Sequence, residues 1–74
     1  MIGMLWYDNN PNTDMMAKIA KAADFYQQKY GQRPNVCWVH AQVDWNGKSS
    51  DIAIRYSGYI MPNHYLLSVE REAA

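Results

Sequence analysis

The sequence predicts an α+β domain in which a single amphipathic helix packs on a small, mainly antiparallel sheet of three to four strands. Two observations predict this class. Apolar residues recur every three or four positions over residues 14–30, which is the spacing of a helix with one buried side. Short apolar or alternating runs, bounded by turn-forming residues, precede that helix and follow it. The predicted order of elements is therefore β-α-β-β-β, within one domain over residues 1–74.

The first strand is predicted over residues 2–7, which are apolar and too few for a helix. Such a run is typical of a strand that is covered on both faces or lies at a contact between subunits. Residues 8–14 then gather turn formers and helix caps, so the helix should begin at Asp14. It should end just before Gly31, which favours the left-handed conformation that follows a helix, and Pro34 cannot continue one.

The helix should bury one side only. Its apolar side holds Met15, Ile19, Ala22, Tyr26 and Tyr30. Its polar side holds Lys18, Lys21, Gln28 and Lys29. A helix of about four to five turns cannot cover a four-stranded sheet completely, so we expect the other face of the sheet to meet a second copy of the chain.

Three more strands are predicted after the helix. Residues 35–43 are apolar on both alternating faces, which is typical of a central strand, whereas residues 51–57 and 64–71 alternate like half-buried strands. The Asn46-Gly47 pair favours a turn, so the first two of these strands should be joined by a hairpin loop. The residues that share one face are Ile52, Ile54 and Tyr56 in one alternating run, and Tyr65, Leu67 and Val69 in the other.

Length, charge and cysteine content narrow the function classes. A core built from 74 residues supplies only about 3–5 kcal/mol, so additional stabilisation is expected. Cys37 is the only cysteine, which excludes an intrachain disulfide and favours self-association instead. Seven basic residues balance seven acidic ones, unlike the composition of a dedicated nucleic-acid binder. No apolar run can span a bilayer and no signal-peptide pattern is present, so we expect a cytoplasmic protein without membrane contact.

Three segments stand out as motifs. They are Met-Leu-Trp-Tyr-Asp at residues 4–8, Tyr-Gly-Gln-Arg-Pro-Asn-Val-Cys-Trp-Val-His at residues 30–40, and Met-Pro-Asn-His-Tyr-Leu-Leu-Ser-Val-Glu at residues 61–70. Together they resemble a group of small prokaryotic proteins for which no activity is known. In that group a proline usually follows the histidine of the central motif, whereas this chain has Ala41. The resemblance implies a compact natural fold and no particular chemistry.

Cys37 and His40 are three residues apart, a spacing that suits a metal or nucleophile-base pair only in a turn. On a strand, an odd spacing sends the two side chains to opposite faces of the sheet unless a bulge intervenes. Free cysteines are among the residues most often buried. We therefore expect Cys37 to be a buried, unreactive thiol.

His40 and His64 are the other candidate pair, because their imidazoles would approach each other if the two strands are neighbours. A metal site would need a third ligand, which Asp44 or Asp51 could supply from the loop. The simpler expectation is that both histidines lie at strand ends, partly exposed and hydrogen-bonded, with no metal or other cofactor.

The leading functional hypothesis is a non-enzymatic homodimer that acts as a small interaction or regulatory module. Aromatic residues are abundant, and aromatic side chains are enriched at protein interfaces. The residues expected at the contact are Trp6, Tyr7, Trp38 and Tyr65.

Two alternatives stay open. The first is binding of single-stranded nucleic acid, with bases stacked on sheet aromatics beside Arg33, Arg55 and Lys48. The second is an enzyme whose composite site, built from His40 and His64, lies at a dimer interface. No phosphate-binding glycine loop or nucleophile elbow supports a particular reaction.

Overall fold

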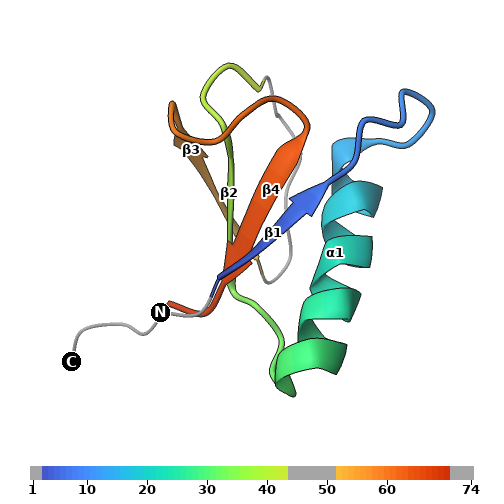
Figure 1. Cartoon of the computed structure of the whole chain (residues 1–74), viewed down its shortest axis with the longest axis vertical. Helices are drawn as coiled ribbons and strands as arrows, with labels where there is room; N and C mark the ends of the chain where they lie inside the picture. The colour runs from blue at the N-terminus through green and yellow to red at the C-terminus, as the bar shows by residue number, and fades with distance from the viewer. Residues whose placement is uncertain (1–2, 44–51, 71–74) are drawn as a thin grey trace.

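The computed structural model describes residues 3–43 and 52–70. It confirms the α+β class and the predicted order of elements (Figure 1). The strands are shorter than predicted; the second, for example, ends at His40, where a turn begins in which the Val43 amide donates to the His40 carbonyl at 3.1 Å. The elements are β1 (Gly3–Tyr7), α1 (Met15–Tyr30), β2 (Val36–His40), β3 (Ala53–Ser57) and β4 (His64–Ser68).

The four strands form one mixed sheet in the order β1-β4-β2-β3. β4 is antiparallel to both of its neighbours, β1 and β2. β1 and β2 therefore run in the same direction with β4 between them, and α1 connects them as in a split β-α-β unit.

The predicted hairpin between β2 and β3 is wrong, because these two strands pair in parallel. A hairpin joins antiparallel neighbours, whereas parallel neighbours need a crossover connection. Val43 and Ile52, at the two ends of that connection, both pack against the core. The Asn46-Gly47 pair that suggested the hairpin lies outside the described residues.

Helix α1 begins and ends where the sequence predicted. The Asp14 carboxylate caps the first turn by accepting a hydrogen bond from the Ala17 amide at 2.8 Å. Gly31 adopts the left-handed conformation, with φ 72°, and its amide donates to the Gln27 carbonyl at 2.8 Å. In the part of the chain that the structure describes, no helix combines the length and apolarity that crossing a membrane requires.

The core lies between α1 and one face of the sheet, which we call the helix face. Ala22 and Ala23 are completely buried, and such small side chains allow the helix backbone to approach the strands. Lys18, which the sequence assigned to the polar side, is only 8% exposed. A lysine can cover apolar surface with its methylene stem, so α1 buries a wider stripe than its apolar residues alone indicate. The other buried core residues are Ile19, Tyr26, Cys37, Val39, Ile52, Tyr65 and Leu67.

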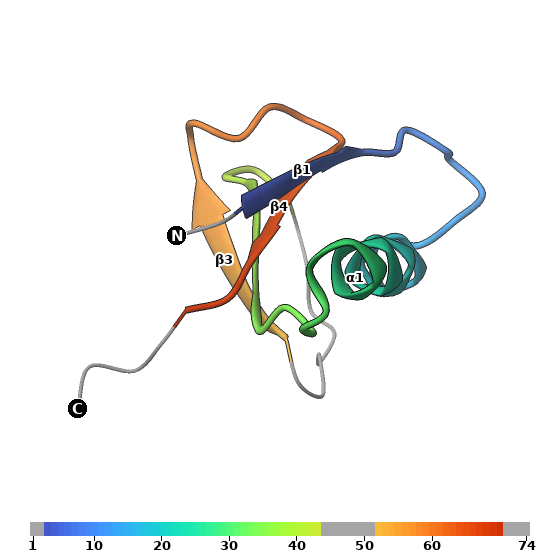
Figure 2. The same ribbon diagram turned by 60° about the horizontal axis from the view of Figure 1, so that its bottom comes forward.

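The opposite face of the sheet carries no helix among the described residues, and we call it the open face (Figure 2). The expectation that one helix covers one face only is confirmed. The open-face residues are Gly3, Leu5 and Tyr7 of β1, His64, Leu66 and Ser68 of β4, Val36, Trp38 and His40 of β2, and Ala53, Arg55 and Ser57 of β3.

Asn35, the residue before β2, joins three strands. Its side-chain amide donates to the Glu70 carbonyl at 2.8 Å, and its side-chain oxygen accepts from the Glu70 amide at 2.7 Å. Its backbone amide donates to the Ser68 carbonyl, and its backbone carbonyl accepts from the Ala53 amide. The side chain thus extends the β4 pairing by one step beyond the end of the strand.

Candidate functional site: the open face and the edge of β1

β1 is an edge strand with two exposed apolar side chains. Leu5 and Tyr7, both on the open face, are 61% and 56% exposed. The Asp8 amide donates to the Asn63 carbonyl at 3.0 Å, in the register that pairs Tyr7 with His64. Because pairing alternates along an antiparallel strand, the backbone groups of alternate residues face away from β4. Those residues are Gly3, Leu5 and Tyr7.

Leu66 makes the open face continuous across β1 and β4. A Cβ atom added to Gly3 would lie 3.0 Å from Leu66 Cδ1, so the Leu66 side chain lies directly over the β1 backbone. The pairing register places Leu66 opposite Leu5 on one side and opposite Trp38 on the other. An apolar row therefore crosses three strands, from the β1 edge to the centre of the sheet.

The apolar row ends at β3, where Arg55 forms an ion pair. The Arg55 guanidinium lies over the Trp38 ring, 5.6 Å from its centroid, and its Nη2 is 2.7 Å from the Glu70 carboxylate. Asn35 and Arg55 also line a shallow pocket of about 180 Å³ with Glu70. The positive charge at this end of the open face is therefore balanced by a neighbouring carboxylate.

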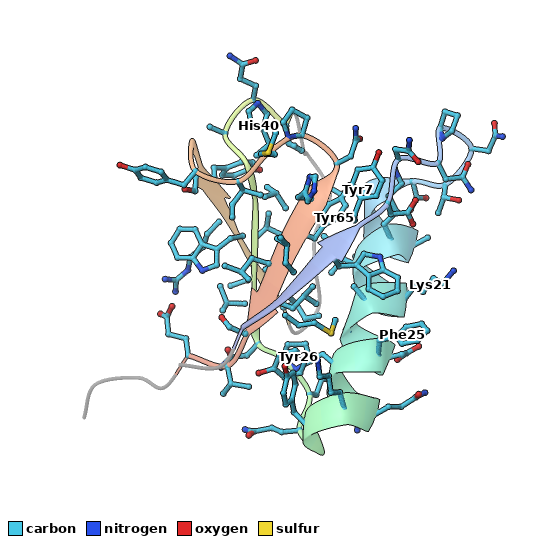
Figure 3. The ribbon with its side chains drawn as sticks, viewed as in Figure 1. Tyr7, Lys21, Phe25, Tyr26, His40 and Tyr65 are labelled. Carbon is cyan, nitrogen blue, oxygen red and sulfur yellow. The ribbon has the colours of Figure 1, made fainter. Side chains whose placement is uncertain are left out.

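His40 and His64 lie beside each other at one end of the open face. The β2–β4 pairing ends at Val39 and Tyr65, and His40 and His64 are the next residues of the two strands beyond that pair. The ring of Tyr7 follows on β1, with its centroid 4.8 Å from that of His64. Figure 3 shows Tyr7 and His40 at the same end of the sheet.

Each histidine is held by a backbone carbonyl. Nδ1 of His40 lies 2.8 Å from the Ile60 carbonyl oxygen, and Nδ1 of His64 lies 2.9 Å from that of Pro62. Across residues 3–43 and 52–70 there is no group of three histidine, cysteine or acidic side chains that could hold a metal ion. Asp44 and Asp51, the third ligands that the sequence suggested, lie outside the described residues.

Cys37 lies on the helix face, away from His40, as the odd spacing predicted. It is completely buried, and burial raises the pKa of its thiol to about 12. The predicted burial of Cys37 is confirmed, and a thiol with a raised pKa is a poor nucleophile.

The structure divides the four expected contact residues between the two faces. Tyr7 and Trp38 lie on the open face, whereas Trp6 and Tyr65 pack in the core on the helix face. Trp6 packs on Phe25 of the helix with 4.9 Å between ring centroids. Tyr65 is 6% exposed, and its burial, together with the charge of Asp8, raises the pKa of its phenol.

Leu5 and Leu66 belong to the apolar row but are not among the contact residues that the sequence predicted. Aromatic character alone does not identify the face of a strand, because Trp6 and Tyr7 lie on opposite faces of β1. The signal was available, because Leu5 shares a face with Tyr7 at a spacing of two, and Leu66 shares one with His64.

No family model, curated protein or solved structure matches this chain. The features of the molecule that bear on function are therefore the open face, the β1 edge and the histidine pair.

Proposed function

We propose that this protein is a small, non-enzymatic interaction module that forms a homodimer by pairing β1 of one subunit with β1 of the other. The observation that carries the proposal is that β1 combines outward-facing backbone groups with exposed apolar side chains, Leu5 and Tyr7, on the same strand. An unpaired edge offers a template for another strand, and an apolar edge gains by being covered.

The sequence of β1 lacks the features that keep edge strands apart. Such strands commonly carry a lysine, a proline or a bulge. β1 reads Gly-Met-Leu-Trp-Tyr, without charge or proline, and pairs with β4 residue for residue. The other edge strand, β3, carries Arg55 on the open face. This contrast favours β1 as the edge that pairs.

A two-fold axis at Leu5 makes β1 complementary to itself. Leu5 would then face Leu5 of the partner subunit, and Gly3 would face Tyr7 of the partner subunit. The outward-facing backbone groups of Gly3, Leu5 and Tyr7 would form about six intersubunit hydrogen bonds, two for each facing pair. β1 carries no charged residue, so pairing it with a second copy brings no like charges together. A second copy of the chain is therefore the partner that best fits the β1 edge.

Self-association accounts for the open face better than nucleic-acid binding does. Arg55 lies over an aromatic ring, as a base-stacking surface would require, but its charge is balanced by Glu70. Binding of single strands depends on unbalanced positive charge along the sheet. The exposed part of the face nearest β1 is instead apolar and uncharged.

The test is the oligomeric state of matched lysine variants. Leu5→Lys places a charge at the proposed two-fold axis, where both copies meet. Met61→Lys introduces the same charge at a site of similar exposure, 67% against 61%, in the loop before β4. Light scattering coupled to size-exclusion chromatography should give a dimer for the natural sequence and for Met61→Lys, and a monomer for Leu5→Lys.

Two results would overturn the proposal. A natural chain that is monomeric at micromolar to high-micromolar concentration would remove the dimer itself. A Leu5→Lys variant that stays dimeric would remove the β1 edge as the contact. Circular dichroism of both variants checks that the fold is intact, which is expected because both substituted side chains are exposed.

A further inference from the structure

His40 and His64 are arranged in a way that two unrelated, hydrogen-bonded surface residues would not need. His40 and His64 each lie one position beyond the last paired residues of β2 and β4, Val39 and Tyr65, and both lie on the same face of the sheet. Two imidazole rings at neighbouring positions of adjacent strands can reach one small ion between them.

The hydrogen bonds define the proton positions on both rings. A backbone carbonyl oxygen can only accept, so Nδ1 of His40 donates to Ile60 and Nδ1 of His64 donates to Pro62. In a neutral ring the proton on Nδ1 leaves Nε2 with a free lone pair. Neither Nε2 atom has a hydrogen-bond partner among residues 3–43 and 52–70.

This arrangement is the one that metal-binding histidines adopt. Such a histidine usually donates its other ring N–H to a backbone carbonyl or carboxylate, which fixes the tautomer and the orientation of the ring. Here both supporting carbonyls come from the loop between β3 and β4, so one segment orients both rings.

We propose that His40 and His64 together bind a single divalent transition-metal ion of the zinc class through their two Nε2 atoms. Imidazole nitrogen suits zinc, copper and nickel, with zinc–nitrogen distances of about 2.0–2.1 Å. Because no third histidine, cysteine or acidic side chain lies beside the pair in the described part of the chain, water completes the coordination. Both histidines are half-buried on the open face, and the site does not depend on the β1 contact proposed above.

The test uses substitutions that preserve the supporting hydrogen bonds. Asparagine places its side-chain nitrogen close to the position of histidine Nδ1, so it can still donate to the carbonyl, but it has no atom at the position of Nε2. Isothermal titration calorimetry with zinc chloride should give one ion per chain for the natural sequence. In His40→Asn and in His64→Asn the affinity should fall at least about tenfold, since loss of an outer-shell partner alone costs about 10–100-fold.

A control separates this site from unspecific binding to the sheet surface. Glu70→Gln removes a carboxylate of the open face that lies beside Arg55, away from the histidines. Its zinc affinity should equal that of the natural chain. Circular dichroism should show the same folded spectrum for all variants.

A second measurement examines the two rings directly. Long-range ¹H–¹⁵N spectra should show the Nδ1-protonated tautomer for both histidines before zinc is added, and zinc should shift both Nε2 resonances together. The proposal is overturned if only one histidine responds, if either single variant keeps the natural affinity, or if the natural chain binds no more tightly than a variant lacking both histidines.

Discussion

Asn35 provides the sharpest test of how the sheet is held together. Asn35→Ala removes the two side-chain hydrogen bonds to the backbone of Glu70, at 2.8 and 2.7 Å, and leaves the Asn35 backbone bonds in place. A hydrogen bond contributes about 0.5–1.5 kcal/mol net, and Asn35 is exposed, so water partly replaces the lost partners. We expect the free energy of unfolding to fall by about 1–2 kcal/mol.

The loss is large for a chain of this size. A change of 1 kcal/mol shifts the melting temperature of a small domain by about 4–8 °C, so Asn35→Ala should melt about 5–15 °C lower. Circular dichroism against temperature and urea measures both quantities. All samples need the same protein concentration, because association would make the melting temperature depend on concentration.

Local readouts separate the two hydrogen bonds. In Asn35→Ala the Glu70 amide should lose its protection from hydrogen exchange. Asn35→Asp keeps an acceptor for that amide but faces the Glu70 carbonyl with an oxygen, so it should retain protection and still lose stability. Asn9→Ala is the matched control, because the Asn9 side chain makes no hydrogen bond within the described chain. Equal stability of Asn35→Ala and Asn9→Ala, or a Glu70 amide that stays protected in Asn35→Ala, would refute the reasoning.

Three further predictions concern the helix ends and the buried thiol. Gly31→Ala should lower the free energy of unfolding by about 1–2 kcal/mol, because φ is 72° there, and Gly31→Asn should cost less; urea denaturation of both variants decides. Asp14→Ala should lower the free energy of unfolding by about 1 kcal/mol, whereas Asp14→Asn should lower it little, because asparagine also caps helices. Equal losses in the two variants would argue against the cap. Burial raises the pKa of the Cys37 thiol from 9.0 to about 12, so its contribution to stability is fully present below pH 9 and is lost as the pH rises towards 12. Cys37→Ala should therefore have a shallower decline in stability over that range, and thiol reagents should label Cys37 only on unfolding.

The helix could be predicted closely because its signals are local. Asp14 and Gly31 define its ends through contacts within one turn, and the spacing of Ile19, Ala22 and Tyr26 defines its buried side. Strand faces were predictable for the same reason, since alternation is a property of each strand alone.

The strand order could not be predicted, because pairing depends on contacts between distant segments. Nothing local to β2 shows that β3 lies parallel to it, and the Asn46-Gly47 pair pointed to the opposite arrangement. The histidine pair shows the same limit. The sequence supplied His40 and His64, but their adjacency follows from the β2–β4 register and their ring orientation from the loop carbonyls.

The position of β4 constrains the order in which the chain can fold. β4 is the last of the described strands in chain order, yet it lies between β1 and β2, the two strands that α1 connects. Until β4 has been synthesised, β1 and β2 have no partner between them, and the apolar side of α1 has an incomplete surface to cover. β1, α1 and β2 therefore cannot complete their packing before β4 is available. This favours a late, cooperative closure of the sheet over stepwise growth from the N-terminus.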